Sequence, residues 1–181
     1  MKTREIVDNE FEKIILKELD GINDLELLIL KGHILIEFSL NKFISDLNDG
    51  GIDVDKTNFS FYSKIYVAEL LGLFKSKDHL KVSIVDINKL RNQIAHKLSF
   101  DKKLLEKIIA VYIKLNVSGS KVDKAKSDFE NLYYIIIAVC GLIMGKKIAN
   151  QKIKRFTFDQ LKLLMKENPE KFSTEFNNYG K

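Results

Sequence analysis

The sequence predicts an all-α fold, a single bundle of about six to seven helices that takes in residues 1–181 as one domain. The chain has one proline and nine glycines, so little interrupts a helix. Apolar residues recur at intervals of three and four, and no segment shows the strict alternation of an amphipathic strand. Several segments open with a capping box, in which a Ser, Thr or Asn precedes a Glu or Gln by three residues.

The first half of the chain predicts four helices. The first covers roughly residues 5–19. The second covers residues 23–47 and opens with a capping box at Asn23 and Glu26. Its apolar residues at helical spacing include Leu27, Leu30, Ile34 and Phe38.

Turn-forming residues fill the loop at 48–58, and a shorter helix at 59–73 is closed by Gly72. His79 falls in the next loop, where we expect it to be exposed to solvent. The fourth helix covers residues 83–98, with a core stripe formed by Ile84, Ile87, Leu90, Ile94 and Leu98.

The second half predicts three more helices. Asp101 caps a helix that runs to residue 113. The helix at 127–151 opens with Ser127 and Glu130 as a capping box and is apolar on most faces, which is typical of a centrally buried helix. The last helix starts at Thr157 and ends near Pro169. The helices within 122–172 would complete the bundle.

The amino-acid composition indicates where in the cell the protein is found and whether it meets a membrane. Apolar residues make up 45% and charged residues 30%, as in ordinary globular domains. The single cysteine, Cys140, lies in an apolar run and is expected in the core. The N-terminus has no secretory signal, and the apolar run at 132–144 is shorter than the ~20 residues that span a bilayer. These features predict a cytoplasmic protein without a membrane partner.

The net charge is +5, and part of the excess lies in residues 146–155, which contain no acidic residue. Such a segment favours phosphate-bearing partners through counterion release. A solvated helix end is the alternative, because lysines near a helix C-terminus also complement the macrodipole.

Most enzyme chemistries have no counterpart in this sequence. It has no glycine-rich phosphate loop, no metal-ligand spacing of Cys and His, and no serine nucleophile elbow, so we expect no metal and no cofactor. One polar helix face remains, where Asn88, Asn92 and His96 are spaced i, i+4, i+8 and Arg91 lies beside them. Arg91 is one of three arginines in a chain with 27 lysines.

Arg91 and His96 are five residues apart, which separates them by about 140° around a straight helix. Both can therefore serve one reacting group only if the helix unwinds near His96, if their long side chains bridge the difference, or if a two-fold dimer brings two copies into a shared cleft. The spacing thus favours a homodimer.

The segment "LRNQIAH", with Arg, Asn, three residues and His at the end of an amphipathic helix, resembles the motif of the HEPN superfamily of helical nucleotide-binding and ribonuclease domains. "KGHILIEFSLNKFI" looks like the long second helix of several HEPN subfamilies. "FYSKIYVAELLGLF" followed by "INKLRNQIAHKLSF" has their order and spacing. The resemblance covers roughly residues 23–115.

The resemblance implies metal-independent cleavage of RNA, with a 2′,3′-cyclic phosphate and a 5′-hydroxyl as products. His96 would move protons and Arg91 would hold the phosphate, a planar bidentate task that suits arginine better than lysine. Asn92 would orient the imidazole or the phosphate, and Asn88 and Lys97 would contact the substrate. The protein would then be a toxin or phage-defence effector, held in check by an antitoxin or another regulatory protein.

Other interpretations stay open. One HEPN group carries a tyrosine two residues after the histidine, where this chain has Leu98, so chemistry that depends on that tyrosine is not expected. The long helix is also similar to mannitol-repressor-like regulators, which implies a noncatalytic regulatory or binding module. A third interpretation is an antitoxin-like protein that uses residues 146–155 as its partner surface.

Individual residues also have structural alternatives. Arg91 suits an ion pair at a helix surface, and His96 suits a bond to a carbonyl at the helix end. His33 and Glu37, one turn apart, suit either a buried hydrogen-bonded pair or an auxiliary acid near the cleft. The tyrosines, among them Tyr62 and Tyr66, are expected in the core or an interface. If Tyr62 or Tyr66 is exposed, it suits stacking on a base.

Overall fold

A computed structural model of the chain describes residues 8–47, 54, 57, 59–75, 77–97, 99–117 and 121–149, with the backbone alone for Asp8, Asn9 and residues 146–149. Within these residues the fold is all-α and without strands, as predicted, and its helices pack as one bundle. The six helices are α1 (Asp8–Leu19), α2 (Leu25–Leu47), α3 (Phe61–Leu70), α4 (Asp78–Lys97), α5 (Lys102–Leu115) and α6 (Asp128–Ala149).

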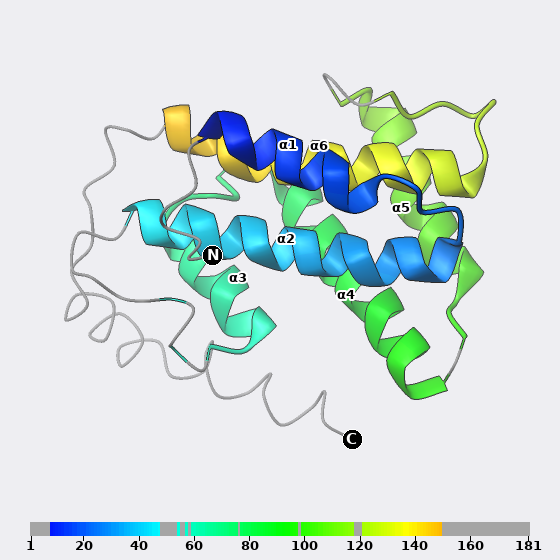
Figure 1. Ribbon diagram of the computed structural model, residues 1–181, viewed down its shortest axis with the longest axis horizontal. Coiled ribbons are helices and arrows are strands. Elements are labelled where there is room, and N and C mark those ends of the chain that lie inside the picture. Colours follow the sequence, from blue (N-terminus) through cyan, green and yellow to red (C-terminus); the bar gives the residue numbers. More distant parts are fainter. Residues whose placement is uncertain are drawn as a thin grey trace.

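Two long helices, α2 and α6, form the centre of the bundle. α6 packs against α1, α2, α4 and α5, whereas α2 packs against α1, α3, α4 and α6. Figure 1 shows α1 running opposite to α2 and α6, while α4 crosses behind α2. Gly32 permits the close approach of the two central helices, because a Cβ at this position would lie 2.3 Å from the side chain of Ile136.

The predicted helix around residues 23–47 is present, but its predicted apolar stripe is only partly correct: Leu30 and Phe38 pack against the core, whereas the other two do not. Leu27 and Ile34 are exposed, at 45% and 58%, and the buried face instead includes Leu28, Ile36 and Phe43. This helix carries apolar residues almost all round, so periodicity alone does not determine which face enters the core. Its N-terminal cap also differs from the prediction: Asp24 Oδ1, not Asn23, accepts from the N–H of Leu27 at 2.7 Å.

The other predicted caps that fall within the described residues are confirmed. Ser127 and Glu130 form a reciprocal capping box, since each side chain accepts a hydrogen bond from the backbone N–H of the other residue. Asp101 caps α5 by accepting from the N–H of Lys103 at 2.9 Å. Gly72 follows α3 with a φ of 82°, and the bonds from Gly72 N–H to Glu69 and from Leu73 N–H to Ala68 form a Schellman motif.

α4 begins earlier than predicted, and this moves His79 out of the expected loop. The helix starts at Asp78, whose carboxylate lies in the first turn, where it complements the macrodipole. Leu80 is fully buried and extends the core stripe by one turn, which favours helix over loop here. His79 is half-buried, with its ring 6.3 Å from that of Tyr112 in an edge-on arrangement. The predicted stripe of α4 is otherwise confirmed through Ile94.

α6 has the central position predicted for it. The stretch Asp128–Gly145 is long and apolar enough to cross a membrane by length and composition, and 39% of it is buried in the bundle. Cys140 is buried on this helix, as expected, next to Ser39 of α2. Several predicted features lie outside the described residues: the start of the first helix, Leu98, the side chains of the basic segment 146–155, and the helix after Thr157.

Candidate functional site

The predicted site residues lie along α4, and their exposure rises from its buried middle to its C-terminal end. Asn88 is buried, at 4% exposure, whereas Arg91 and Asn92 are half-buried at the edge of the bundle. His96 and Lys97 are exposed in the last turn. In Figure 1 this end of α4 projects past α2 and away from α3. The helix therefore presents its polar residues in a graded series.

Arg91 is oriented by its neighbour. Its guanidinium Nη1 donates to Asn92 Oδ1 at 2.9 Å. A guanidinium has five N–H donors, and this bond uses one of them, so the planar group is positioned while four donors remain for other partners. Arg91 and Asn92 thus form the pair that the sequence placed side by side.

The structure also brings His33, from the middle of α2, to the inner side of this pair. His33 is buried, at 5% exposure, and its ring lies 4.4 Å from that of Phe61. Asn88 and Arg91 of α4 lie close enough to the imidazole to influence its pKa. His33 Nε2 is buried without a hydrogen-bond partner.

Burial lowers the pKa of His33 to about 4. The nearby Glu37 carboxylate and the polar side chain of Asn88 oppose this effect, while the charges of Arg91 and Lys64 add to it. Since the resulting pKa is far below neutrality, the imidazole is uncharged at pH 7.

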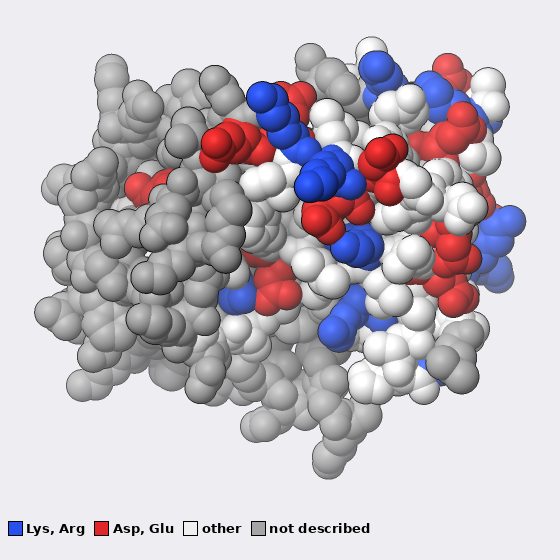
Figure 2. Space-filling model, viewed as in Figure 1, with Lys and Arg blue, Asp and Glu red and all other residues white. Residues whose placement is uncertain are grey.

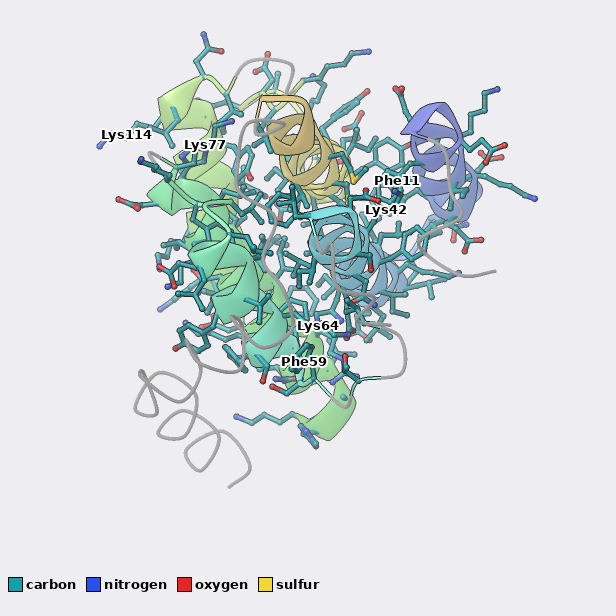
Figure 3. All side chains as sticks on the ribbon, turned by 90° about the vertical axis from the view of Figure 1, so that its left-hand side faces the viewer. Phe11, Lys42, Phe59, Lys64, Lys77 and Lys114 are labelled. Carbon is teal, nitrogen blue, oxygen red and sulfur yellow. The ribbon has the colours of Figure 1, made fainter. Side chains whose placement is uncertain are left out.

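Lys64 of α3 is the third contribution to the site, beside those of α2 and α4. Its ammonium Nζ lies 2.6 Å from Glu37 Oε1, and the lysine side chain is 9% exposed against 32% for the glutamate. Figure 3 shows Lys64 between α3 and α2, on the side of α2 away from Lys42. We define the His33 cluster as His33, Glu37, Lys64, Asn88 and Arg91, which come from three helices.

The cluster differs in part from what the sequence suggested. His33 is buried, but the ion-pair partner of Glu37 is Lys64, so His33 and Glu37 are not an isolated pair. Lys64 was missed because nothing marks it among the 27 lysines of the chain. His96 lies outside the cluster, on the exposed end of α4.

Two further properties bear on the chemistry. Within the described residues, no three His, Cys, Asp or Glu side chains are grouped so as to hold a metal ion. On the face shown in Figure 2, basic and acidic side chains are interspersed over the described surface. The cationic groups that stand out near the site are therefore individual side chains, Arg91 and Lys97 at the edge and Lys64 inside.

No protein-family model, no curated protein sequence and no solved structure matches this chain. What is established is an all-helical protein with six helices in its described part and a polar cluster joining α2, α3 and α4.

Proposed function

We propose that this protein is a metal-independent endoribonuclease of HEPN type that acts as a homodimer. The observation that carries the proposal is the arrangement on α4: a guanidinium held in place by Asn92 at the edge of the core, and an exposed imidazole on the same helix at His96. A phosphate-binding arginine needs a fixed orientation, and a proton-transferring histidine needs access to substrate.

In the proposed reaction, the ribose 2′-OH attacks the adjacent phosphate. The P–O5′ bond breaks, the proton lost by the 2′-OH ends on the 5′-oxygen, and a 2′,3′-cyclic phosphate is left. Arg91 binds the phosphate oxygens bidentately and stabilises the negative charge that builds on them. His96 moves the proton, and Asn92 orients the phosphate or the imidazole. Lys97, exposed beside His96, attracts the RNA backbone, whereas Asn88 acts from inside through its contact with His33.

Dimerisation supplies the geometry that one helix lacks. Arg91 and His96 diverge by about 140° on a regular helix, and α4 is helical through Lys97. Because the last turn of α4 is exposed and projects from the bundle, two copies related by a two-fold axis can bring their α4 ends together. Arg91 of one copy would then share a cleft with a histidine of the other.

The decisive experiment is incubation of the purified protein with cellular RNA in EDTA, with analysis of the fragment ends. Wild type should release 2′,3′-cyclic phosphate ends, and His96→Ala and Arg91→Lys should not. His79→Gln is the matched control, because His79 lies at the other end of α4, about 25 Å along the helix axis. This variant should cleave like wild type.

The alternative function is a noncatalytic binding module. The exposed apolar side chains of Leu27 and Ile34 on α2 favour it, since they offer a surface for a protein partner. Lack of cleavage by folded, dimeric wild type would rule out the nuclease and favour this module. Expression alone separates the two as well: a nuclease toxin or phage-defence effector without its inhibitory partner should arrest growth, and Arg91→Ala should relieve the arrest.

A further inference from the structure

Asp86 is a buried carboxylate on α4 that the proposed reaction does not use. Two ammonium groups bind its two oxygens separately. Lys89 Nζ, on the same helix, lies 2.9 Å from Oδ1, and Lys107 Nζ, on α5, lies 3.2 Å from Oδ2. We define the Asp86 cluster as these three residues. Because two positive charges face one negative charge, the cluster has a net charge of +1.

The two lysines of the cluster are open to solvent, although the carboxylate is not. The side chains of Lys89 and Lys107 are 41% and 61% exposed, against 3% for Asp86. Asp86 accepts one hydrogen bond from each ammonium, and an ammonium has three N–H donors. A molecule that approaches from solvent therefore meets N–H donors that are held in place by a carboxylate behind them.

The cluster lies on the same face of α4 as His96. Lys89 and His96 are seven positions apart, which is about 20° around a regular helix and about 10 Å along its axis. Arg91 diverges from His96 by about 140°. Gln93 Oε1 also accepts from the N–H of Asp101 at 2.9 Å, so the contacts between α4 and α5 run antiparallel. This pairing places Lys107 beside Lys89, two turns from His96 along α4.

A purely structural ion pair explains only part of this arrangement. Linking α4 to α5 requires the contact of Asp86 with Lys107 alone. Lys89 adds a second cation from the helix that already carries Asp86, and a partly exposed pair of this kind contributes little to stability. The excess cation is therefore available for an external anion, and a phosphate diester carries one negative charge.

We propose that the Asp86 cluster is a second phosphate-binding site for a single strand of RNA, an inference that rests on the proposed function. The strand passes from His96 along α4, and one of its phosphates accepts hydrogen bonds from Lys89 and Lys107. Asp86 is the positioning residue for both ammonium groups. The bound phosphate lies about two to three nucleotides from the scissile one, given a spacing of at least about 3.4 Å per nucleotide.

The first test measures the binding of a single-stranded DNA oligonucleotide, which has the phosphates but no 2′-OH and is not cleaved. Lys107→Met should weaken binding at low salt by about three- to tenfold. It should also reduce the slope of log Kd against log salt concentration by about 0.7, the value for one phosphate contact on a single strand. Lys114→Met is the matched control, an exposed lysine two turns farther along α5, and should leave the slope unchanged.

The second test locates the phosphate by replacing one linkage of the DNA strand at a time with a neutral methylphosphonate. In wild type, a replacement two to three linkages from the one at the α4 end should weaken binding. In Lys107→Met and in Lys89→Met the same replacement should have no further effect, whereas in Lys114→Met it should weaken binding as in wild type. Such non-additivity assigns the phosphate to the Asp86 cluster.

The outcomes separate this site from the proposed function. RNA cleavage by wild type, together with additive effects of Lys107→Met and every methylphosphonate in proteins of equal melting temperature, would keep the nuclease and overturn the second site. Equal losses of affinity in Lys107→Met and Lys114→Met would overturn it as well. Non-additivity without RNA cleavage would keep the phosphate site and reject the nuclease. No binding of DNA and no cleavage of RNA would overturn both.

Discussion

The inner and outer halves of α4 belong to one helix and to one sequence motif, yet they provide different environments. In the inner half, Asn88 is buried at 4% exposure and lies close enough to His33 to influence its pKa. In the outer half, His96 and Lys97 are exposed. Arg91 and Asn92 lie where the two halves meet. The position of a polar residue along a helix therefore decides whether its side chain is part of the buried interior or is accessible to a substrate.

The largest expected effect belongs to the outer half. His96→Ala should lower the rate of RNA cleavage by about 10²–10⁴-fold, the usual contribution of a general acid or base. The free energy of unfolding should stay within about 0.5 kcal/mol of wild type, because the residue is exposed. Cleavage assays and urea titrations on the same preparations measure both. A clear loss of stability in this variant would contradict the view that the outer half of α4 does not contribute to folding.

The next effect belongs to the inner half and depends on pH. The pKa of His33 is lowered to about 4 in the folded protein, from 6.5. Between these values the unfolded chain binds more protons than the folded one, so stability is complete above pH 6.5 and is lost as the pH falls toward 4. The loss is up to about 3 kcal/mol.

Other charges face the imidazole, namely Glu37 on α2, Lys64 on α3 and Arg91 on α4, and carboxylates elsewhere also titrate in acid. The control is therefore the double variant His33→Phe/Asn88→Leu, which replaces the imidazole and the polar side chain near it with apolar groups. Urea titrations from pH 4 to pH 7.5 should show a steeper loss in wild type than in the double variant. Parallel curves would contradict the buried, neutral state of His33.

A third prediction tests how firmly the inner half is held. Gly32→Ala should lower the free energy of unfolding by about 1–3 kcal/mol, because its Cβ would lie 2.3 Å from Ile136 and force the two central helices apart. Gly141→Ala is the matched control on α6: apart from its chain neighbours and its own helix backbone, no atom lies within 4 Å of its Cβ, and alanine should stabilise this helix by about 0.5–1 kcal/mol. Opposite signs are expected in thermal melts, and equal signs would argue against the close packing at Gly32.

The smallest effect concerns the turn that anchors the outer half. Gln93 Oε1 accepts from the backbone N–H of Asp101 at 2.9 Å, and the Asp101 side chain caps α5. Asp101→Ala should lower stability by about 1 kcal/mol through the lost cap. Asp101→Asn, which can still cap, should lose only a small part of this. Both variants should cleave RNA at the wild-type rate, since neither changes α4 itself.

Local signals predicted much of the fold. The capping box at Ser127, the cap at Asp101 and the glycine at position 72 involve neighbours in the chain, so the sequence alone reveals them. The stripe of α4 was equally clear, because polar residues separate its apolar ones. The orientation of α2 was not predictable in this way, since apolar residues cover most of its surface and the packing of α6 at Gly32 selects the buried face.

The site was harder to predict than the fold. The sequence singled out Arg91 and Asn92, which are adjacent, and the structure places them in contact. The contact of His33 with Asn88 joins two helices that are distant in the chain, and no spacing rule connects them. The contribution of Lys64 could not be predicted for the same reason. A graded series from buried to exposed along α4 also depends on where the neighbouring helices end.

Cys140 gives the molecule a built-in reporter. It is the single cysteine of the chain, it is 2% exposed, and burial raises the pKa of its thiol to about 12. Thiol reagents attack the thiolate, which is scarce in this environment, so labelling requires that α6 separate from α2. The rate of labelling therefore counts the openings of the bundle, and it does so in the native chain without an added probe.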